Sequence, residues 1–219
     1  MVHFVIRKDV YDELSKNFYF QKGGVAVGTI SGHSIKTKDN PVRWEVMNDS
    51  NVLQYASEKQ RRIYFANKAH YVDNSVTQIP GVNKKNYKTI ATGIFNQMDI
   101  DVADKSNPII CKLLKKPVTS ISRHLLNAKK HTVPEMVIRT SLLPFVFPII
   151  QKYGVFAGNR IEPDGNKSTE LIARAKITVK GKVKKVGISV ILKDTDASGL
   201  ELVFISVFPV ESNLIKSYI

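Results

Sequence analysis

Alternating apolar and polar positions mark the last quarter of the chain. Between residues 171 and 179 apolar residues occupy every second position, and the polar or basic residues Arg174, Lys176 and Thr178 lie between them. This period of two predicts a strand with one buried face. The runs 185–192 and 200–208 predict two further strands, and Gly181 and the stretch 194–199 supply turn residues. We therefore expect an antiparallel meander at this end of the chain.

Helical signals precede the meander. A helix is expected to begin at Ser120 or Ser122 and to run to about Lys130. Thr132 and Glu135 form a Thr-x-x-Glu capping box, which predicts a second helix to about residue 143. The apolar run 145–151 predicts a strand. The fold class is thus α+β, with helices followed by an antiparallel sheet of about four strands in the C-terminal part.

The first half of the chain predicts a mixed α+β part. Short strands are expected at 3–6 and 25–30, and helices at 8–16, 51–69 and 87–97. The stretch 98–107 is polar and acidic and ends at Asn107-Pro108, so we place a boundary there. Residues 1–107 then form an N-terminal part of unknown role, and residues 108–219 form a basic α+β domain.

Positive charge is concentrated in one third of the sequence. The formal net charge is +14, and residues 109–185 carry sixteen Lys/Arg against four Asp/Glu, a net charge of +12. A localised excess of this kind favours an acidic partner, most commonly nucleic acid, either RNA or DNA. The basic residues do not form one amphipathic helix, so we expect no membrane partner. The competing interpretation is a plain solvated surface.

Neither a disulfide nor a metal site is expected. Cys111 is the single cysteine, and the five histidines are scattered without metal-ligand spacing. Motifs for nucleotide, zinc or serine-hydrolase chemistry are lacking, so no cofactor is predicted. Arg7 and Lys8 interrupt the N-terminal apolar residues, which argues against a secretory signal. We expect a cytoplasmic protein.

The segment 122–131 carries the most suggestive chemistry. If it is helical, Arg123, Lys130 and His131 lie near one face, and His124 lies two turns from His131. Histidine transfers protons, and lysine or arginine stabilises the charge of a phosphorane. These groups suffice for metal-free cleavage of RNA, in which the 2′-OH attacks the phosphate. The alternative is a solvated basic helix end.

Other candidate residues lie on the predicted strands. Ser206, in an apolar strand, is expected to share a sheet surface with Ser189 and Thr178, although an ordinary sheet hydroxyl is the alternative. We add Ser206 to the catalytic candidates Arg123, His124, Lys130 and His131. The candidate nucleic-acid-binding residues are Lys129, Arg139, Arg174, Lys176, Lys184 and Lys185.

The order of these features resembles the BECR superfamily of small nucleases, which includes barnase, EndoU, colicin E5/D and RelE-like proteins. The resemblance covers residues 117–212: a helix with Arg123-His124 and Lys129-Lys130-His131, a second helix ending near Pro144, and a meander with Arg174, Lys176 and Ser206. It implies a metal-independent ribonuclease of toxin or phage-defence type, using helix His, Lys and Arg groups with hydroxyl or basic groups from the sheet.

Two other functions stay open. The protein could grip DNA or RNA without cutting it. It could also be a DNA-cleaving, restriction-type endonuclease, because Pro163-Asp164 and Glu170 are similar to the start of a PD-(D/E)xK site. No Glu-x-Lys follows in the next strand, however, so the lysine that this chemistry needs is missing.

Overall fold

A six-stranded mixed sheet forms the centre of the computed structural model, which describes residues 58–126, 131–195 and 198–211. The strand order is β1-β2-β6-β5-β4-β3. β2 and β6 are parallel, and the other neighbours are antiparallel. The strands are β1 (Ile110–Cys111), β2 (Lys116–Ile121), β3 (Val155–Ile161), β4 (Lys167–Val179), β5 (Lys182–Asp194) and β6 (Leu202–Pro209). The predicted α+β class and the β4-β5-β6 meander are confirmed.

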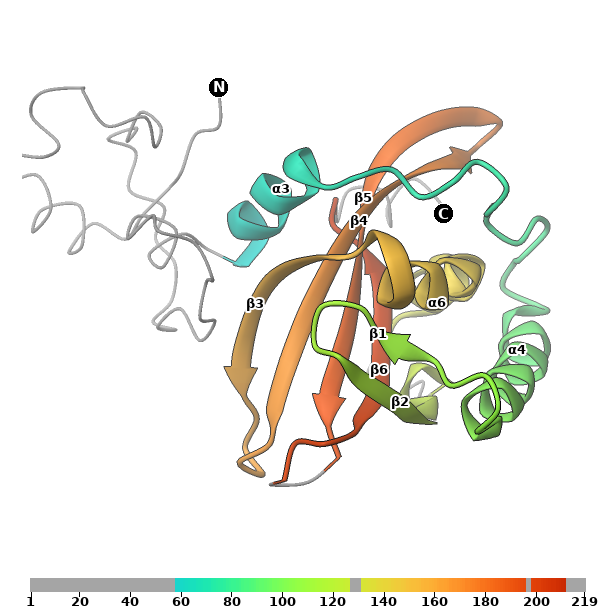
Figure 1. The fold of residues 1–219 in the computed structure, drawn as a ribbon. Coiled ribbons are helices and arrows are strands. Elements are labelled where there is room, and N and C mark those ends of the chain that lie inside the picture. The colour runs from blue at the N-terminus through green and yellow to red at the C-terminus, as the bar shows by residue number, and fades with distance from the viewer. Residues whose placement is uncertain (1–57, 127–130, 196–197, 212–219) are drawn as a thin grey trace, which may run out of the picture.

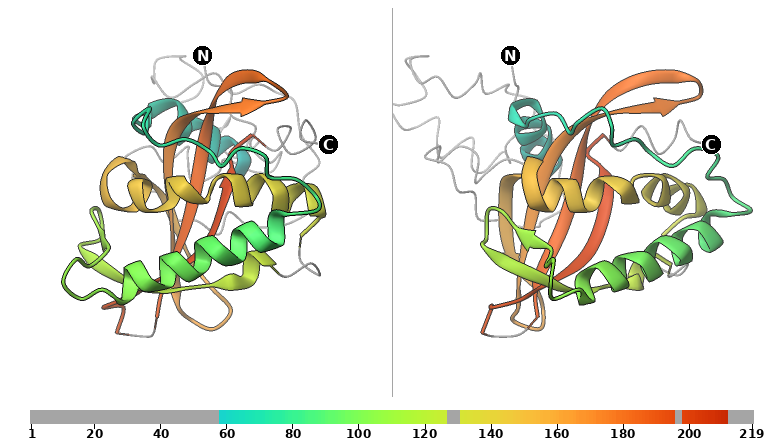
Figure 2. Two further views of the ribbon diagram at one scale, coloured as in Figure 1. Left: turned by 90° about the vertical axis from the view of Figure 1, so that its right-hand side faces the viewer. Right: turned by 45° about the vertical axis from the view of Figure 1, so that its right-hand side comes forward.

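Helices cover both faces of this sheet (Figure 1). α3 lies against one face, and α4 and α6 lie on the other, where Figure 2 shows the helical segments crossing the strands. The helices and helical turns are α3 (Glu58–Lys68), α4 (Tyr87–Ala103), η2 (Arg123–Leu126), α5 (Val133–Ser141), η3 (Leu143–Phe145), α6 (Val146–Pro148) and η4 (Ile149–Tyr153). Among the described residues no single helix is both long and apolar enough to cross a membrane, although α5 taken together with the bent segment Leu143–Tyr153 meets the length and composition test.

The alternation along β4 produces the two sheet faces. Leu171, Ala173 and Ala175 are buried on the α4 and α6 side, in a core that includes Phe95 and Phe145. The intervening side chains of β4 face α3 or solvent, as the period of two predicts.

On its other face the sheet approaches α3 closely. A Cβ atom on Gly187 of β5 would lie 2.6 Å from the Cβ of Ala66, so glycine is required for α3 to pack at this distance. Phe65 and Ala66 of α3 pack with Ile172 of the sheet in a second, smaller core. Through this contact α3 presents its polar side chains to the strands.

Two predicted elements are wrong, and the helix expected at 87–97 is longer than predicted. Residues 116–121 form β2, and of the described residues within the expected helix Arg123–Leu126 is a 3-10 turn, because Val118, Ser120 and Ile121 pair with β6. Residues 145–151 are helical, since an apolar run buried on all sides has the same pattern in a helix as in a strand. Residues 98–103 continue α4, in which Met98 is buried and the acidic side chains of Asp99 and Asp101 are partly exposed.

Parts of both halves predicted from the sequence contribute to this fold. α3 and α4 come from residues 1–107 and pack on the sheet formed by residues 110–209. The predicted boundary falls in the loop between α4 and β1, and the division into two domains stays a prediction. The elements expected at 3–6, 8–16 and 25–30 lie outside the described residues.

Candidate active site

Two histidines that are seven residues apart in the sequence meet side by side. His124 lies in η2, and His131 precedes Thr132, the N-cap residue of α5. Their Nε2 atoms are 3.1 Å apart, and their ring planes are inclined by 73°. One ring must donate the hydrogen and the other must accept it, so at least one imidazole is uncharged while the contact holds. The pair is thus a place where a proton can be taken up or released.

The surrounding candidates are only partly gathered at this pair. In the structure the two histidines come from a 3-10 turn and from the start of α5, whereas the sequence predicts both on one helix. Arg123 is directed to α4, where its Nη2 donates to Asn96 Oδ1 at 2.8 Å and pairs with Asp99. Lys129 and Lys130 lie outside the described residues.

Glu135 stands in the first turn of α5 and belongs to the predicted capping box, which is confirmed. The Thr132 backbone N–H donates to Glu135 Oε2 at 2.8 Å. Burial raises the pKa of Glu135, but the hydrogen bonds from Thr132 and the charges of Arg139 and His131 outweigh it. The pKa therefore lies below its ordinary value, and the carboxylate is ionised at neutral pH.

Arg139 follows Glu135 one helical turn later, on the same face of α5. Its Nη1 donates to Ser206 Oγ at 2.8 Å, and its guanidinium carbon lies 5.3 Å from the ring centroid of Phe208. Within the part of the chain that the structure describes, the buried Nε of Arg139 has no hydrogen-bond partner. Burial lowers the pKa of Arg139, the charge of Glu135 raises it, and the charge of Arg62 lowers it. Because the ordinary pKa of arginine lies far above neutral pH, Arg139 stays charged.

The edge of β6 gives Arg139 its access to Ser206. In the described structure, β2 pairs with β6 only as far as Phe204, so Ser206 and Phe208 have a strand neighbour on one side alone. Ser206 is opposite Ile191, two residues from Ser189, so the expected shared face of the two serines is confirmed. The hydroxyl of Ser206 thus accepts a hydrogen bond from the side chain of Arg139.

The guanidinium of Arg62 also contacts Phe208, from α3. Arg62 of α3 lies with its guanidinium carbon 4.8 Å from the ring centroid. Its Nε donates to Glu170 Oε1 at 2.6 Å. The aromatic ring thus contacts two cations, one from α3 and one from α5. Each cation is attracted to the negative π face of the ring.

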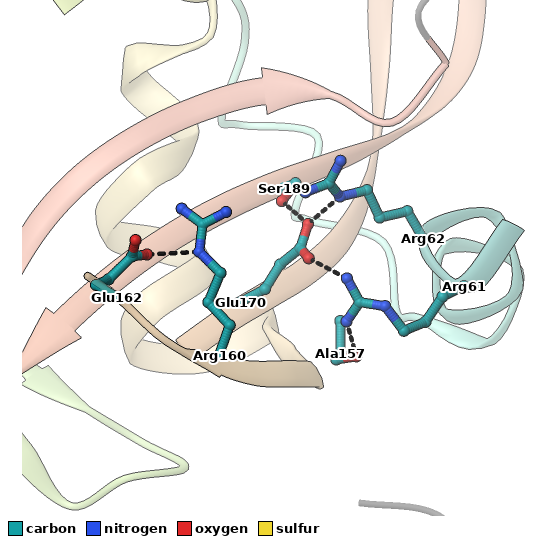
Figure 3. A network of polar contacts seen from close by, with 7 residues as sticks. All are labelled: Arg61, Arg62, Ala157, Arg160, Glu162, Glu170 and Ser189. Carbon is teal, nitrogen blue, oxygen red and sulfur yellow. Dashed lines mark hydrogen bonds and ion pairs between the residues drawn. The ribbon is translucent and has the colours of Figure 1, made fainter. Parts of the chain in front are cut away.

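Glu170 is the centre of a buried network that holds Arg62 in place (Figure 3). Arg61 Nη2 donates to Glu170 Oε2 at 2.9 Å, and Ser189 Oγ donates to Oε1. Arg61 Nη1 also donates to the carbonyl oxygen of Ala157. Arg61 and Glu170 are fully buried, and two guanidinium groups share the one carboxylate. The network carries a net positive charge beside Arg139.

The remaining binding candidates form a separate group. Arg174, Lys176, Lys184 and Lys185 lie in the outer half of the β4–β5 hairpin, and the three lysines are exposed. The structure therefore divides the predicted cationic residues between the β6 edge and this hairpin.

The acidic residues considered for a restriction-type site are bound to cations. Asp164 pairs with Lys193, and Glu170 pairs with the two arginines of α3. Among residues 58–126, 131–195 and 198–211 there is no group of three or more His, Cys, Asp and Glu side chains placed to hold a metal ion.

Sequence reasoning missed three residues of this region. Glu135 was recognised as a helix cap only, although its spacing of four from Arg139 already placed both side chains on one helical face. Arg62 and Phe208 are 146 positions apart in the sequence and meet only through the packing of α3 on the sheet. Their contact has no local sequence signal.

Comparisons of the chain with protein-family models, with curated proteins and with solved structures found no match. The interpretation of this site therefore depends on its geometry.

Proposed function

We propose that this protein is a metal-independent ribonuclease. The observation that carries the proposal is the contact between His124 and His131, with His131 close enough to Glu135 for their charges to interact. Glu135 in turn interacts with Arg139. A proton carrier, an ionised carboxylate and a guanidinium are the groups that transphosphorylation of RNA requires.

The groups divide the reaction as follows. Glu135 accepts the proton of the ribose 2′-OH, and the 2′ oxygen attacks the adjacent phosphorus. The bond from phosphorus to the 5′ oxygen breaks, and His131 donates a proton to that leaving oxygen. The products are a 2′,3′-cyclic phosphate and a 5′-hydroxyl end. Arg139 stabilises the charge that builds on the phosphate oxygens. His124 positions the ring of His131 through the shared hydrogen bond.

Three expectations from the sequence belong to this proposal. They are the resemblance to BECR nucleases, the toxin or phage-defence role and the cytoplasmic location. The positive charge of residues 109–185 supports the nucleic-acid substrate on which the first two depend.

Two substitutions test the assigned roles. Glu135→Gln keeps the capping box, which accepts glutamine at this position, and removes the base. His131→Ala removes the acid. General acid–base groups contribute about 10²–10⁴-fold, so each variant should cleave RNA slower by about that factor with nearly unchanged RNA affinity. Initial rates on labelled RNA and a binding titration measure the two quantities.

His70→Ala is the matched control, because His70 is an exposed histidine away from Glu135 and Arg139 in the sequence. It should cleave at the wild-type rate. The roles are refuted if Glu135→Gln and His131→Ala, folded as judged by circular dichroism, keep the wild-type rate.

A second candidate function is binding of nucleic acid without cleavage. The exposed lysines of the β4–β5 hairpin favour it, because they offer phosphate contacts and no reactive group. Tight RNA binding by the wild-type chain with no cleaved product would select this function.

A further inference from the structure

The outer half of the β4–β5 hairpin has one face packed on the main core and one face directed away from it. The side chains buried on the core face are Ala175, Ile177, Val179 and Val186. The side-chain amide of Gln78 donates to the Thr178 carbonyl oxygen at 2.8 Å and accepts from the Thr178 backbone N–H at 3.1 Å. Gln78 thus lies along the outer edge of β4. A partner that lies across the two strands must therefore approach from the α3 side of the sheet.

On the α3 side, cations and an aromatic ring lie next to one another. α3 ends at Lys68, and the hairpin continues past it (Figure 1). Arg174, Lys176 and Lys185 alternate with the buried residues, so their side chains are on this face. The segment after α3 forms a bridge from Tyr71 to Arg174. The ring centroid of Tyr71 is 4.7 Å from the guanidinium carbon of Arg174 and 6.0 Å from Lys185 Nζ. Tyr71, Arg174, Lys176 and Lys185 are named here the Tyr71 surface.

The positive charge of the Tyr71 surface is only partly balanced. No aspartate or glutamate occurs between residues 171 and 193. Glu211 interacts with the charge of Arg174. Lys176 and Lys185 are directly opposite each other, an arrangement of like charges that destabilises a strand pair, and within the described residues neither forms an ion pair. An anionic partner would relieve this repulsion.

The exposed ring of Tyr71 narrows the choice of anionic partner. It is 37% exposed although two cations lie close to it. Unpaired bases stack on tyrosine rings and on arginine guanidinium planes, and both are present here. The bases of a duplex are already stacked on one another, so a duplex would offer its phosphates to the lysines and leave the ring unused. An unpaired strand satisfies both kinds of group.

We propose that the Tyr71 surface binds an unpaired segment of RNA. One base stacks on the plane formed by Tyr71 and Arg174, and the flanking phosphates contact Lys176 and Lys185. Every base has a π face, and lysine contacts phosphate as a point charge without reading bases. The binding is therefore independent of base sequence.

The position of the Tyr71 surface defines the substrate class. Phe208, which contacts Arg139, is opposite Ser189 on β5. Lys185 lies four residues from Ser189 on the same face of that strand, which corresponds to about 13 Å. Resting on the proposed function, an RNA strand that is cleaved beside Arg139 continues onto the Tyr71 surface. The substrate is thus an RNA that is unpaired at the cleavage site and for several nucleotides beside it.

Two double variants compare the two faces of the hairpin at equal loss of charge. Lys176→Gln combined with Lys185→Gln removes both lysines of the Tyr71 surface. The control combines Lys182→Gln with Lys184→Gln, which are exposed lysines of the same hairpin whose positions alternate onto the other face. All variants are made in the His131→Ala background, so that binding is measured without cleavage. The probes are an oligouridine RNA, which stays unpaired, and an RNA duplex of the same length.

The Lys176→Gln, Lys185→Gln variant should bind oligouridine about 10-fold more weakly. Its slope of log K against log salt should fall by about 1.4, because two phosphate contacts to a single strand are lost at about 0.7 each. The control should change the affinity less than about 3-fold. Fluorescence polarisation at several salt concentrations measures both quantities.

A single substitution tests the stacked base. Tyr71→Leu keeps an apolar side chain and removes the ring, so oligouridine should bind about 5–100-fold more weakly, while duplex affinity stays within about 3-fold. Tyr153→Leu is the matched control, because Lys152 Nζ lies 4.9 Å from the ring centroid of Tyr153. It should leave the affinity for both probes unchanged.

Equal losses in the two double variants overturn the proposal. So does unchanged oligouridine binding by Tyr71→Leu, or a loss of duplex binding as large as its loss of oligouridine binding. The proposed function fails separately, if the wild-type protein binds oligouridine through the Tyr71 surface and does not cut it.

Discussion

Glu170 connects the buried contact between α3 and the sheet to the candidate active site. Its carboxylate accepts hydrogen bonds from Arg61, Arg62 and Ser189 while fully buried. A buried charge is tolerated only where such partners compensate for the lost hydration. Because Arg62 contacts both Glu170 and Phe208, the carboxylate also places a cation next to Arg139.

Glu170→Gln should destabilise the fold by about 3–5 kcal/mol, because two arginines then lose their countercharge in a buried site. Urea denaturation gives the free energy of unfolding. Glu162→Gln is the control, since Glu162 pairs with Arg160, which is 37% exposed, and such a pair contributes at most about 1 kcal/mol. Equal losses of stability in the two variants would show that the Glu170 network is no stronger than a surface ion pair.

Residue types were easier to predict than residue contacts. The sequence pointed to His124 and His131 as a pair, because both lie in the basic segment, but it placed them on one helix. The contact of Arg139 with Ser206 links α5 to β6 across 67 positions. Such contacts depend on which edge of the sheet stays open, and no local pattern specifies that.

Among the elements, α5 shows how local chemistry determines both a helix start and a site. Thr132 and Glu135 satisfy each other's backbone N–H groups, and the same turn directs Glu135 towards His131 and Arg139. The capping box was readable from four residues, so this helix was predicted correctly. The helix expected at 120–130 had only a serine as its start signal, and strand pairing with β6 prevailed.

The capping box also makes a prediction for stability against pH. The folded state lowers the pKa of Glu135 from its ordinary value of 4.5, so the ionised carboxylate stabilises the fold above that value. This contribution is lost as the pH falls through the lowered pKa. The wild-type chain should thus be more stable than Glu135→Gln at pH 7, and the difference should vanish at acid pH. Thermal unfolding at several pH values measures it, and a difference that grows towards acid pH would contradict the assignment.

At the scale of the whole molecule, positive charge is organised in two places. One is the β6 edge, where Arg62 and Arg139 flank Phe208, and the other is the outer half of the β4–β5 hairpin. The concentration of charge in residues 109–185 was visible in the sequence. Its division into two regions was not, because it depends on how far β4 and β5 extend past their neighbours and on α3 adding Arg62.

The most direct test of the central claim is the chemistry of the cleaved ends. The wild-type protein is incubated with end-labelled RNA and with DNA in the presence of EDTA, and the products are identified by mass spectrometry. The account predicts cleavage of RNA alone, with 2′,3′-cyclic phosphate and 5′-hydroxyl ends, because the 2′ oxygen is the nucleophile. Cleavage that requires Mg²⁺, or that cuts DNA, would contradict it and favour the restriction-type alternative.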